Sequence, residues 1–254
     1  MANQGINSNR TESLEAVRSH WKDKTIVEGY EQSRYGNIRR SLSHYLDCDA
    51  IDAFIKNNFG NEDILLLDLA CGTARLTRTI FRQNRKIISM DYSENMLLDA
   101  KNKAERQSMP FYPVRADGFC LPFKTNSFNG IFTVRFIRHY KEAERRKIYA
   151  EIYRILKPTG ILILDVLNSD IDKDAYNRPV YDETYTFQEI TQELKENGFI
   201  LQNRLAGNIV KNSLFVIFKK WSLTPLGRWY SKIIRSKKLH LDNASFWMVC
   251  AKRK

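Results

Sequence analysis

The chain of 254 residues is 43% hydrophobic and 28% charged, with a formal net charge of +12. This composition is typical of a globular protein with a full core, and no apolar run is long enough to span a bilayer. The polar first residues show no secretory signal. Four scattered cysteines without a C-x-x-C pair argue against a zinc site and for a reducing compartment. We therefore expect a cytoplasmic protein without a metal centre. The positive charge is compatible with nucleic acid, an anionic membrane, an acidic substrate or simple solubility.

The first part of the chain is predicted to be helical. After a polar tail at residues 1–10, apolar residues recur at helical spacing from Thr11 to Asn58. Gly60 ends this section. We expect residues 1–58 to form a helical cover over a main domain at residues 59–254.

From Asp63 onward, predicted strands and helices alternate. Ser93 suits the N-cap of the second helix, and Pro158 and Gly160 stop the third. This alternation predicts β-α-β units in a doubly wound, mostly parallel α/β sheet. Strands are expected at residues 63–70, 86–91, 111–117, 128–136, 160–166 and 199–205, and helices at residues 74–84, 93–107, 141–156 and 186–198.

Residues 208–242 interrupt this alternation before a final strand at residues 244–254. We interpret them as a helical insertion on the substrate side of the domain. Within it, residues 225–240 combine apolar positions at helical spacing with five basic residues. Such a stretch most often packs on a core, but it also allows weak, peripheral contact with an anionic membrane surface.

Polar side chains follow the predicted strands at the edge where a doubly wound sheet binds ligands. Asp68 ends the first strand, Asp91 the second and Asp117 the third, while residues 135–139 follow the fourth. Small residues at 70–74 let a ligand approach the backbone and the free N–H groups of the next helix. Three acids would repel a triphosphate or a dinucleotide, and the phosphate-binding glycine motifs are absent. The edge favours a ligand with a ribose, an adenine and a cationic centre.

Four motifs in order resemble those of the class I S-adenosylmethionine-dependent methyltransferases. They are LLLDLACGTARLT, SMDYSENMLLDAK, ADGFCLPFKTNSFNGIF and RILKPTGILILDV, and the resemblance runs from about Asn61 to Phe199. It implies a Rossmann-like, seven-stranded sheet with one antiparallel strand, here residues 244–253. The sequence departs from the family pattern at Ala70 and Ala74, where glycines are commoner, and at Asn129, which replaces a usual aspartate.

The resemblance also implies roles for individual residues toward S-adenosylmethionine. The first acid and its loop would hold the methionine portion, and Asp91 would accept hydrogen bonds from the ribose. We expect the Asp91 carboxylate to face the ligand and not the core. Met96 would pack on the adenine, whose edge Asp117 and Gly118 would contact. Cys71 suits a small packed residue better than a nucleophile. The residues assigned to the cofactor are Asp68, Ala70, Cys71, Gly72, Asp91, Tyr92, Met96, Asp117, Gly118 and Arg135.

The side where the acceptor approaches is less sharply defined. His139 follows the fourth strand and has a suitable pKa range for a general base, but it could equally pack at a helix start. Tyr30, Arg34 and Tyr35 resemble a segment that folds over the cofactor, with an ordinary exposed loop as the alternative. Arg138 is a further candidate on this side. We expect the acceptor to enter beneath residues 11–45 and 208–242.

The leading hypothesis is methyl transfer to a small-molecule or lipid-like acceptor. An RNA methyltransferase is the alternative that the charge supports, although no RNA-binding motif or NPPY-like tetrapeptide is present, so no specific nucleic acid is expected. A third hypothesis is a cofactor-binding scaffold without catalysis. A nicotinamide dehydrogenase is disfavoured by the missing phosphate loop.

Overall fold

The computed structural model describes residues 27, 29–32, 38–171, 182–207, 241–242 and 244–254. Several expectations from the sequence lie outside these residues. They concern Arg34, Tyr35, most of the cover before residue 38, and nearly all of the insertion at 208–242, including the basic segment 225–240. Among the described helices, none is long and apolar enough to cross a membrane.

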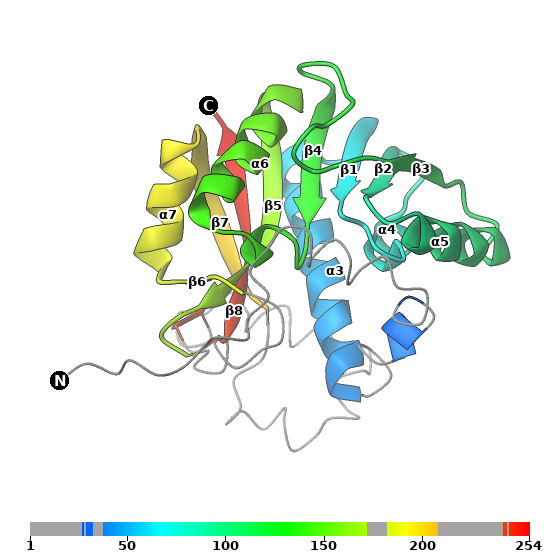
Figure 1. The fold of residues 1–254 in the computed structure, drawn as a ribbon, viewed down its shortest axis with the longest axis horizontal. Helices are drawn as coiled ribbons and strands as arrows, with labels where there is room; N and C mark the ends of the chain where they lie inside the picture. Colours follow the sequence, from blue (N-terminus) through cyan, green and yellow to red (C-terminus); the bar gives the residue numbers. More distant parts are fainter. Residues whose placement is uncertain (1–26, 28, 33–37, 172–181, 208–240, 243) are drawn as a thin grey trace.

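One mixed sheet forms the centre of the described structure (Figure 1). Its strand order is β3-β2-β1-β4-β5-β8-β7, with the short β6 paired to β5 outside this path. The pairs along β3-β2-β1-β4-β5 are parallel, and β8 runs antiparallel to both of its neighbours. The seven-stranded, doubly wound fold with an antiparallel last strand is therefore confirmed. The strands are β1 (Ile64–Leu69), β2 (Arg85–Asp91), β3 (Tyr112–Arg115), β4 (Phe128–Thr133), β5 (Leu156–Asn168), β6 (Thr184–Tyr185), β7 (Phe199–Ala206) and β8 (Phe246–Arg253).

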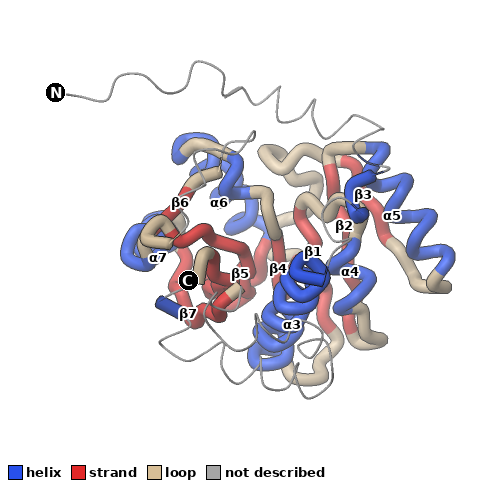
Figure 2. Tube along the Cα trace, turned by 90° about the horizontal axis from the view of Figure 1, so that it is seen from below, coloured by secondary structure: helices blue, strands red, loops and turns tan. Residues whose placement is uncertain are grey.

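Helices cover both faces of the sheet because successive residues of a buried strand point to opposite sides. Leu67 belongs to a core cluster with Tyr149 of α6 and Leu194 of α7, whereas its neighbour Leu66 packs in a second cluster with Ile55 of α3. Figure 2 shows α3 and α6 on opposite sides of the strands. The helices are α3 (Ile38–Phe59), α4 (Arg75–Ile80), α5 (Glu94–Arg106), α6 (Glu142–Ile155) and α7 (Phe187–Glu196), with a 3-10 turn, η1, at Ile137–His139.

The boundaries of some elements differ from the sequence prediction. Helix α4 ends at Ile80 and not near residue 84. Helix α6 ends at Ile155, and β5 begins at the next residue and runs through Pro158 and Gly160. The pairing of β4 with β5 shifts register there, because the extra residues bulge out between two paired positions. Proline, which lacks an N–H donor, is tolerated at such a bulge.

Two helix ends depend on glycines with a positive φ angle. Gly60 follows α3 with φ 59°, and a methyl group built there meets no atom within 4 Å. Gly198 follows α7 with φ 87°, and a methyl group there would lie 2.6 Å from the Tyr153 ring. That ring packs edge-on against Phe199, so it cannot simply move aside.

We predict that Gly60→Ala lowers the free energy of unfolding by about 1 kcal/mol, because only the left-handed backbone is penalised. Gly198→Ala should cost a further ~1–3 kcal/mol through overpacking against Tyr153. Urea unfolding of the two variants and the wild type measures both costs. Equal losses at the two positions would show that the Tyr153 contact does not restrain the α7–β7 turn.

Candidate active site

A cavity lies at the carboxyl ends of β1, β2 and β4, where the order of the strands reverses. It encloses about 760 Å³ of space, including the part open to solvent. Open α/β sheets bind ligands at this switch point. The structure thus brings residues from the ends of three strands to one place.

The loop after β1 forms one wall of the cavity. Ala70 and Gly72 line it, and both have a positive φ, as does Ala74 at the start of α4. An alanine in this conformation carries strain of about 1–2 kcal/mol, and strain of this kind is concentrated at functional sites. The loop is held by two hydrogen bonds to β2, from the Cys71 N–H to the Met90 carbonyl (2.9 Å) and from the Gly72 N–H to Asp91.

Asp91 at the end of β2 has two functions in this arrangement. Its Oδ2 accepts a hydrogen bond from the Gly72 N–H and its Oδ1 accepts one from the Ser93 N–H, both at 2.8 Å. Burial raises the pKa of Asp91, and these N–H groups offset part of that rise. The carboxylate also lines the cavity. The expectation that it faces the ligand and not the core is therefore wrong in part, because the same carboxylate joins the β1 loop to the start of α5.

Helix α5 begins as the sequence predicts. Ser93 is its N-cap, and the hydroxyl accepts a hydrogen bond from the Met96 N–H at 3.3 Å. Tyr92, Ser93 and Met96 all line the cavity beside Asp91. An apolar side chain and an aromatic ring therefore stand next to a carboxylate, an arrangement suited to a nucleoside.

Asp68 lies behind the β1 loop. Its side chain is buried, and Oδ2 accepts a hydrogen bond from the Thr77 hydroxyl of α4 at 2.7 Å. Burial raises the pKa of Asp68 to about 7, a rise that the Thr77 hydrogen bond and the charge of Arg75 only partly offset. Neither Asp68 nor Cys71 is among the residues that line the cavity. Burial also raises the pKa of the Cys71 thiol, as expected of a packed and unreactive cysteine.

Another part of the cavity wall is aromatic. Gly118, after β3, lines the cavity, and a methyl group built there would lie 2.6 Å from the Phe136 ring. Phe136 packs edge-on against Tyr140 at 5.2 Å, and both rings line the cavity. Asp117 does not line it; its Oδ1 accepts a hydrogen bond from the Phe119 N–H at 3.1 Å.

The segment after β4 is held by buried charges. The Arg135 N–H donates to Asp165 of β5 at 2.6 Å, and the Arg135 guanidinium lies 3.8 Å from Asp47 of α3. Arg138 pairs with Asp165 at 2.9 Å and with Asp182 at 3.0 Å. Arg135 lines the cavity, whereas Arg138 does not.

His139 also lines the cavity, and its Nδ1 lies 2.9 Å from Oδ1 of Asp182. A carboxylate therefore lies beside an imidazole that lines the cavity. Nothing in the sequence marks Asp182 or Asp47 as partners of the site, because both lie outside the four motifs. Asp165 lies in the fourth motif, but no role in the site was predicted for it.

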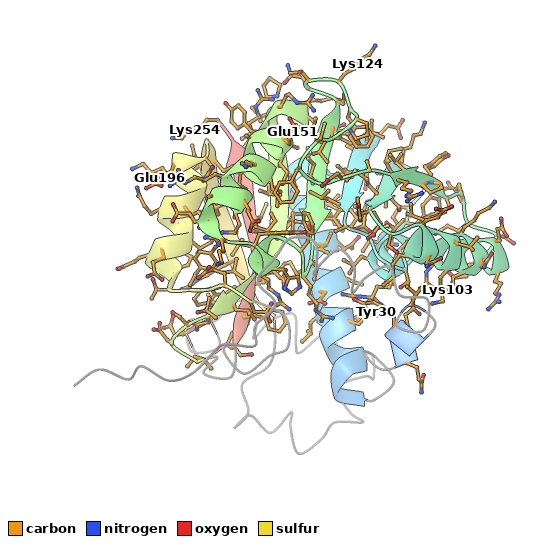
Figure 3. All side chains as sticks on the ribbon, in the orientation of Figure 1. Tyr30, Lys103, Lys124, Glu151, Glu196 and Lys254 are labelled. Carbon is orange, nitrogen blue, oxygen red and sulfur yellow. The ribbon has the colours of Figure 1, made fainter. Side chains whose placement is uncertain are left out.

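A short helical piece at residues 29–32 lies at the strand-end side of the sheet (Figure 1). Tyr30 lines the cavity (Figure 3). Oε1 of Glu31 accepts hydrogen bonds from the Thr73 hydroxyl and the Arg78 guanidinium, both at 2.6 Å, and lies 3.3 Å from Nζ of Lys103. Burial alone would raise the pKa of Glu31, but the Thr73 hydrogen bond and the two cations hold it below its ordinary value. Glu31 thus attaches this piece to the β1 loop, α4 and α5.

The strand order and the cavity at the switch point define a Rossmann-like α/β domain. A family model described as a methyltransferase domain matches residues 66–160. The demethylmenaquinone methyltransferase of Thermus thermophilus is 30% identical over 101 residues, which cover 39% of this chain and 45% of that protein. The glycine/sarcosine N-methyltransferase of Parasynechococcus marenigrum is 33% identical over 111 residues, covering 41% and 38%. The chain thus spans less than half the length of these curated relatives.

Solved structures are similar over most of the chain. The magnesium protoporphyrin IX methyltransferase of Synechocystis, determined with bound S-adenosylhomocysteine, superimposes with a TM-score of 0.66 at 14% identity, covering 95% of this chain and all of that one. At this identity the likeness concerns the fold. With the family match over residues 66–160 and the four motifs, it shows that the chain contains an S-adenosylmethionine-dependent methyltransferase domain with the class I fold.

We predict that Asp68 makes stability fall as pH rises from about 4 to about 7. The folded pKa of about 7 exceeds the unfolded value of 3.8. Between these values the folded state binds a proton that the unfolded state has released, and this stabilisation disappears as the pH rises through about 7. Asp68→Asn keeps an acceptor for Thr77 and has no charge. The unfolding free energy of the variant, relative to that of the wild type, should rise by up to about 1.4 kcal/mol per pH unit between pH 4 and 7.

Urea unfolding of both proteins at several pH values measures this difference in unfolding free energy. The contributions of all other titrating groups are the same in both proteins and cancel. Parallel stability curves would show that the Asp68 carboxyl titrates at its ordinary pKa.

Proposed function

We propose that the protein transfers a methyl group from S-adenosylmethionine to a small-molecule or lipid-like acceptor. The observation that carries this proposal is the position of the Asp91 carboxylate beside the Gly72 backbone, at the switch point and in a cavity that Phe136 and Tyr140 also line. The carboxylate and the loop suit the cofactor, and the aromatic wall suits an apolar or ring-bearing acceptor.

The residues present fit S-adenosylmethionine chemically. A carboxylate has about four acceptor sites, and the backbone N–H groups of Gly72, Ser93 and Tyr92 occupy up to three of them, so Asp91 can still accept from a ribose hydroxyl. Tyr92 and Met96 offer surfaces for the adenine, and the turn at Gly118 offers backbone groups to its edge. A methyl group built on Gly72 would meet only the Met96 sulfur, at 4.0 Å, so the backbone there is open to the methionine portion.

Asp68 and Cys71 do not contact the methionine portion of the cofactor directly; they fix the shape of the β1 loop that would hold it. Arg135 offers a cation at the cavity. The bound cofactor supplies an electrophilic methyl group, which an acceptor in line with the S–CH3 bond can attack. The chain contributes the approach geometry, exclusion of water by Tyr30 and the aromatic wall, and His139 as the group that can take a proton.

The names of the relatives and structural neighbours support a small-molecule acceptor, with a ring system in some of them and without one in the glycine/sarcosine N-methyltransferase. Demethylmenaquinone and magnesium protoporphyrin IX methyltransferases are among them. An RNA acceptor remains the alternative, which the net charge of +12 supports. A scaffold without catalysis is the third hypothesis. Cytoplasmic location and weak anionic membrane contact through residues 225–240 also stay proposals, the latter testable by sedimentation with anionic and neutral vesicles.

The proposal predicts that S-adenosylhomocysteine binds the purified protein in calorimetry, and that S-adenosylmethionine is consumed with a small acceptor. Formation of S-adenosylhomocysteine from S-adenosylmethionine should be measured with quinols, phenols, porphyrin carboxylic acids and a mixed RNA. Turnover with RNA alone would favour the alternative. Binding without turnover on any of these acceptors would favour the scaffold. Absence of binding at millimolar S-adenosylhomocysteine would contradict the proposed methyltransferase function.

We predict that Asp91→Ala weakens S-adenosylhomocysteine binding by about 1.5–3 kcal/mol, the range for hydrogen bonds to a charged group. It should also lower the free energy of unfolding by ~1–3 kcal/mol, because the buried N–H groups of Gly72 and Ser93 lose their acceptor. Calorimetry and urea unfolding measure the two effects.

Glu94→Ala is the matched control, since this nearby carboxylate is 72% exposed and forms an ion pair with the exposed Arg115. It should leave both quantities within about 0.5 kcal/mol of the wild type, as is usual for surface substitutions. Unchanged binding in Asp91→Ala would make Asp91 a purely structural residue.

A further inference from the structure

Glu31 ties a short piece of the cavity wall to three separate elements. Its Oε1 accepts hydrogen bonds from the Thr73 hydroxyl of the β1 loop and from the Arg78 guanidinium of α4, both at 2.6 Å. The ammonium of Lys103 on α5 lies 3.3 Å from the same oxygen. Tyr30, the residue before Glu31, lines the cavity. One carboxylate therefore connects the residue next to Tyr30 with the loop and the two helices beside the cavity.

The charges around Glu31 are balanced and partly shielded from water. Lys103 also pairs with Asp99 at 2.6 Å, so Glu31 and Asp99 together offset the charges of Lys103 and Arg78. The side chains of Arg78, Lys103 and Glu31 are 13%, 23% and 31% exposed. Ion pairs that are partly exposed add little net stability. The consequence of the contacts is therefore geometric, because they restrain where residues 29–32 lie.

The Thr73 contact reaches the part of the loop that we expect to hold the cofactor. Thr73 is 1% exposed and follows Gly72, whose N–H donates to Asp91 at 2.8 Å. Tyr30, Gly72 and Asp91 line the same cavity. A ligand in this cavity meets a wall residue and a loop that Glu31 holds together. Fixing both before the ligand arrives lowers the entropic cost of binding.

We propose that Glu31 is a positioning residue that keeps Tyr30 in the cavity wall and thereby slows release of the S-adenosyl cofactor. This inference rests on the proposed function, because it concerns the ligand that this function requires. Neighbouring residues of a helical piece point about 100° apart, so Tyr30 lines the cavity while Glu31 reaches the loop and the helices. Loss of the tie removes a restraint on Tyr30, and it acts chiefly on the dissociation rate, as most changes at a binding interface do.

The test is binding of S-adenosylhomocysteine to the full-length protein, by calorimetry for the affinity and by a biosensor for the dissociation rate. Glu31→Ala should weaken binding about tenfold, toward the lower end of the usual range for coupled sites, with most of the change in the dissociation rate. Glu31→Gln keeps an acceptor for Thr73 but no charge for Arg78 and Lys103, so its affinity should lie between those of Glu31→Ala and the wild type. A loss below about fivefold in Glu31→Ala overturns the proposal.

A double variant tests whether Glu31 acts through Tyr30. Tyr30→Ala alone should weaken binding at least as much as Glu31→Ala. The variant that carries both substitutions should bind no more weakly than Tyr30→Ala, because the two residues act as one unit. Losses that multiply in the double variant, or normal binding in Tyr30→Ala, would contradict the positioning role.

Asp99→Ala is the matched control. It removes the other carboxylate that pairs with Lys103 and leaves the contacts of Glu31 with Thr73 and Arg78 in place. Its affinity should stay within about twofold of the wild type, as is usual for a substitution outside the tie. A loss equal to that of Glu31→Ala would assign the effect to the charge balance of α5 and overturn the role of the tie.

Urea unfolding separates positioning from stability. A merely structural role of Glu31 would lower the free energy of unfolding and leave the affinity and the dissociation rate of the folded protein unchanged. That result would overturn the proposal, whereas faster dissociation from a variant that is still fully folded supports it. If Glu31→Ala does not fold, Glu31→Gln and Tyr30→Ala still decide the question.

The failure of this inference and that of the proposed function are distinguishable on the same samples. Absence of heat with S-adenosylhomocysteine in the wild type would contradict the methyltransferase function itself. Normal binding by the wild type that Glu31→Ala leaves unchanged would overturn the role of Glu31 and leave the proposed function in place.

Discussion

The site depends on one carboxylate that joins two neighbouring strand ends. Asp91 accepts the N–H of Gly72 from the β1 loop and the N–H of Ser93 at the start of α5. These contacts place an adjacent loop and helix start around one side of the cavity. Because the backbone N–H groups of Gly72 and Ser93 already orient the carboxylate, a ligand that binds it does not have to order it first. Pre-organisation of this kind lowers the entropic cost of binding.

The other side of the cavity is held by charges and not by backbone hydrogen bonding alone. Arg135 and Arg138 follow β4, and their partners Asp165, Asp47 and Asp182 come from β5, α3 and the segment before β6. Buried ion pairs contribute little net stability, since desolvation offsets the attraction. Their value here is geometric, because they hold the turn with His139 and the aromatic wall in one arrangement. A rigid turn suits a reaction in which the acceptor must approach along one line.

The two sides therefore differ in chemistry. Small, strained residues and a carboxylate form one side, while Phe136, Tyr140 and Tyr30 give the other an aromatic character. Glu31 connects the piece carrying Tyr30 to Thr73 of the β1 loop and to Arg78 of α4. A piece that lines the cavity is thus tied to the same loop that Asp91 holds.

The sequence by itself determined the fold class, the alternating elements and the position of the strand-end residues. These follow from local periodicity and from caps such as Ser93, which depend on near neighbours in the chain. The antiparallel last strand was expected only from the resemblance of the motifs to a known family. Tertiary structure alone decided that Asp68 turns to Thr77 behind the loop, that Asp91 binds two backbone N–H groups, and that Asp182 meets His139. No periodic pattern encodes such contacts, because a carboxylate has the same local signature whether it caps a turn, pairs with a distant arginine or faces a ligand. Only the packing of separate elements brings its partner within hydrogen-bond distance.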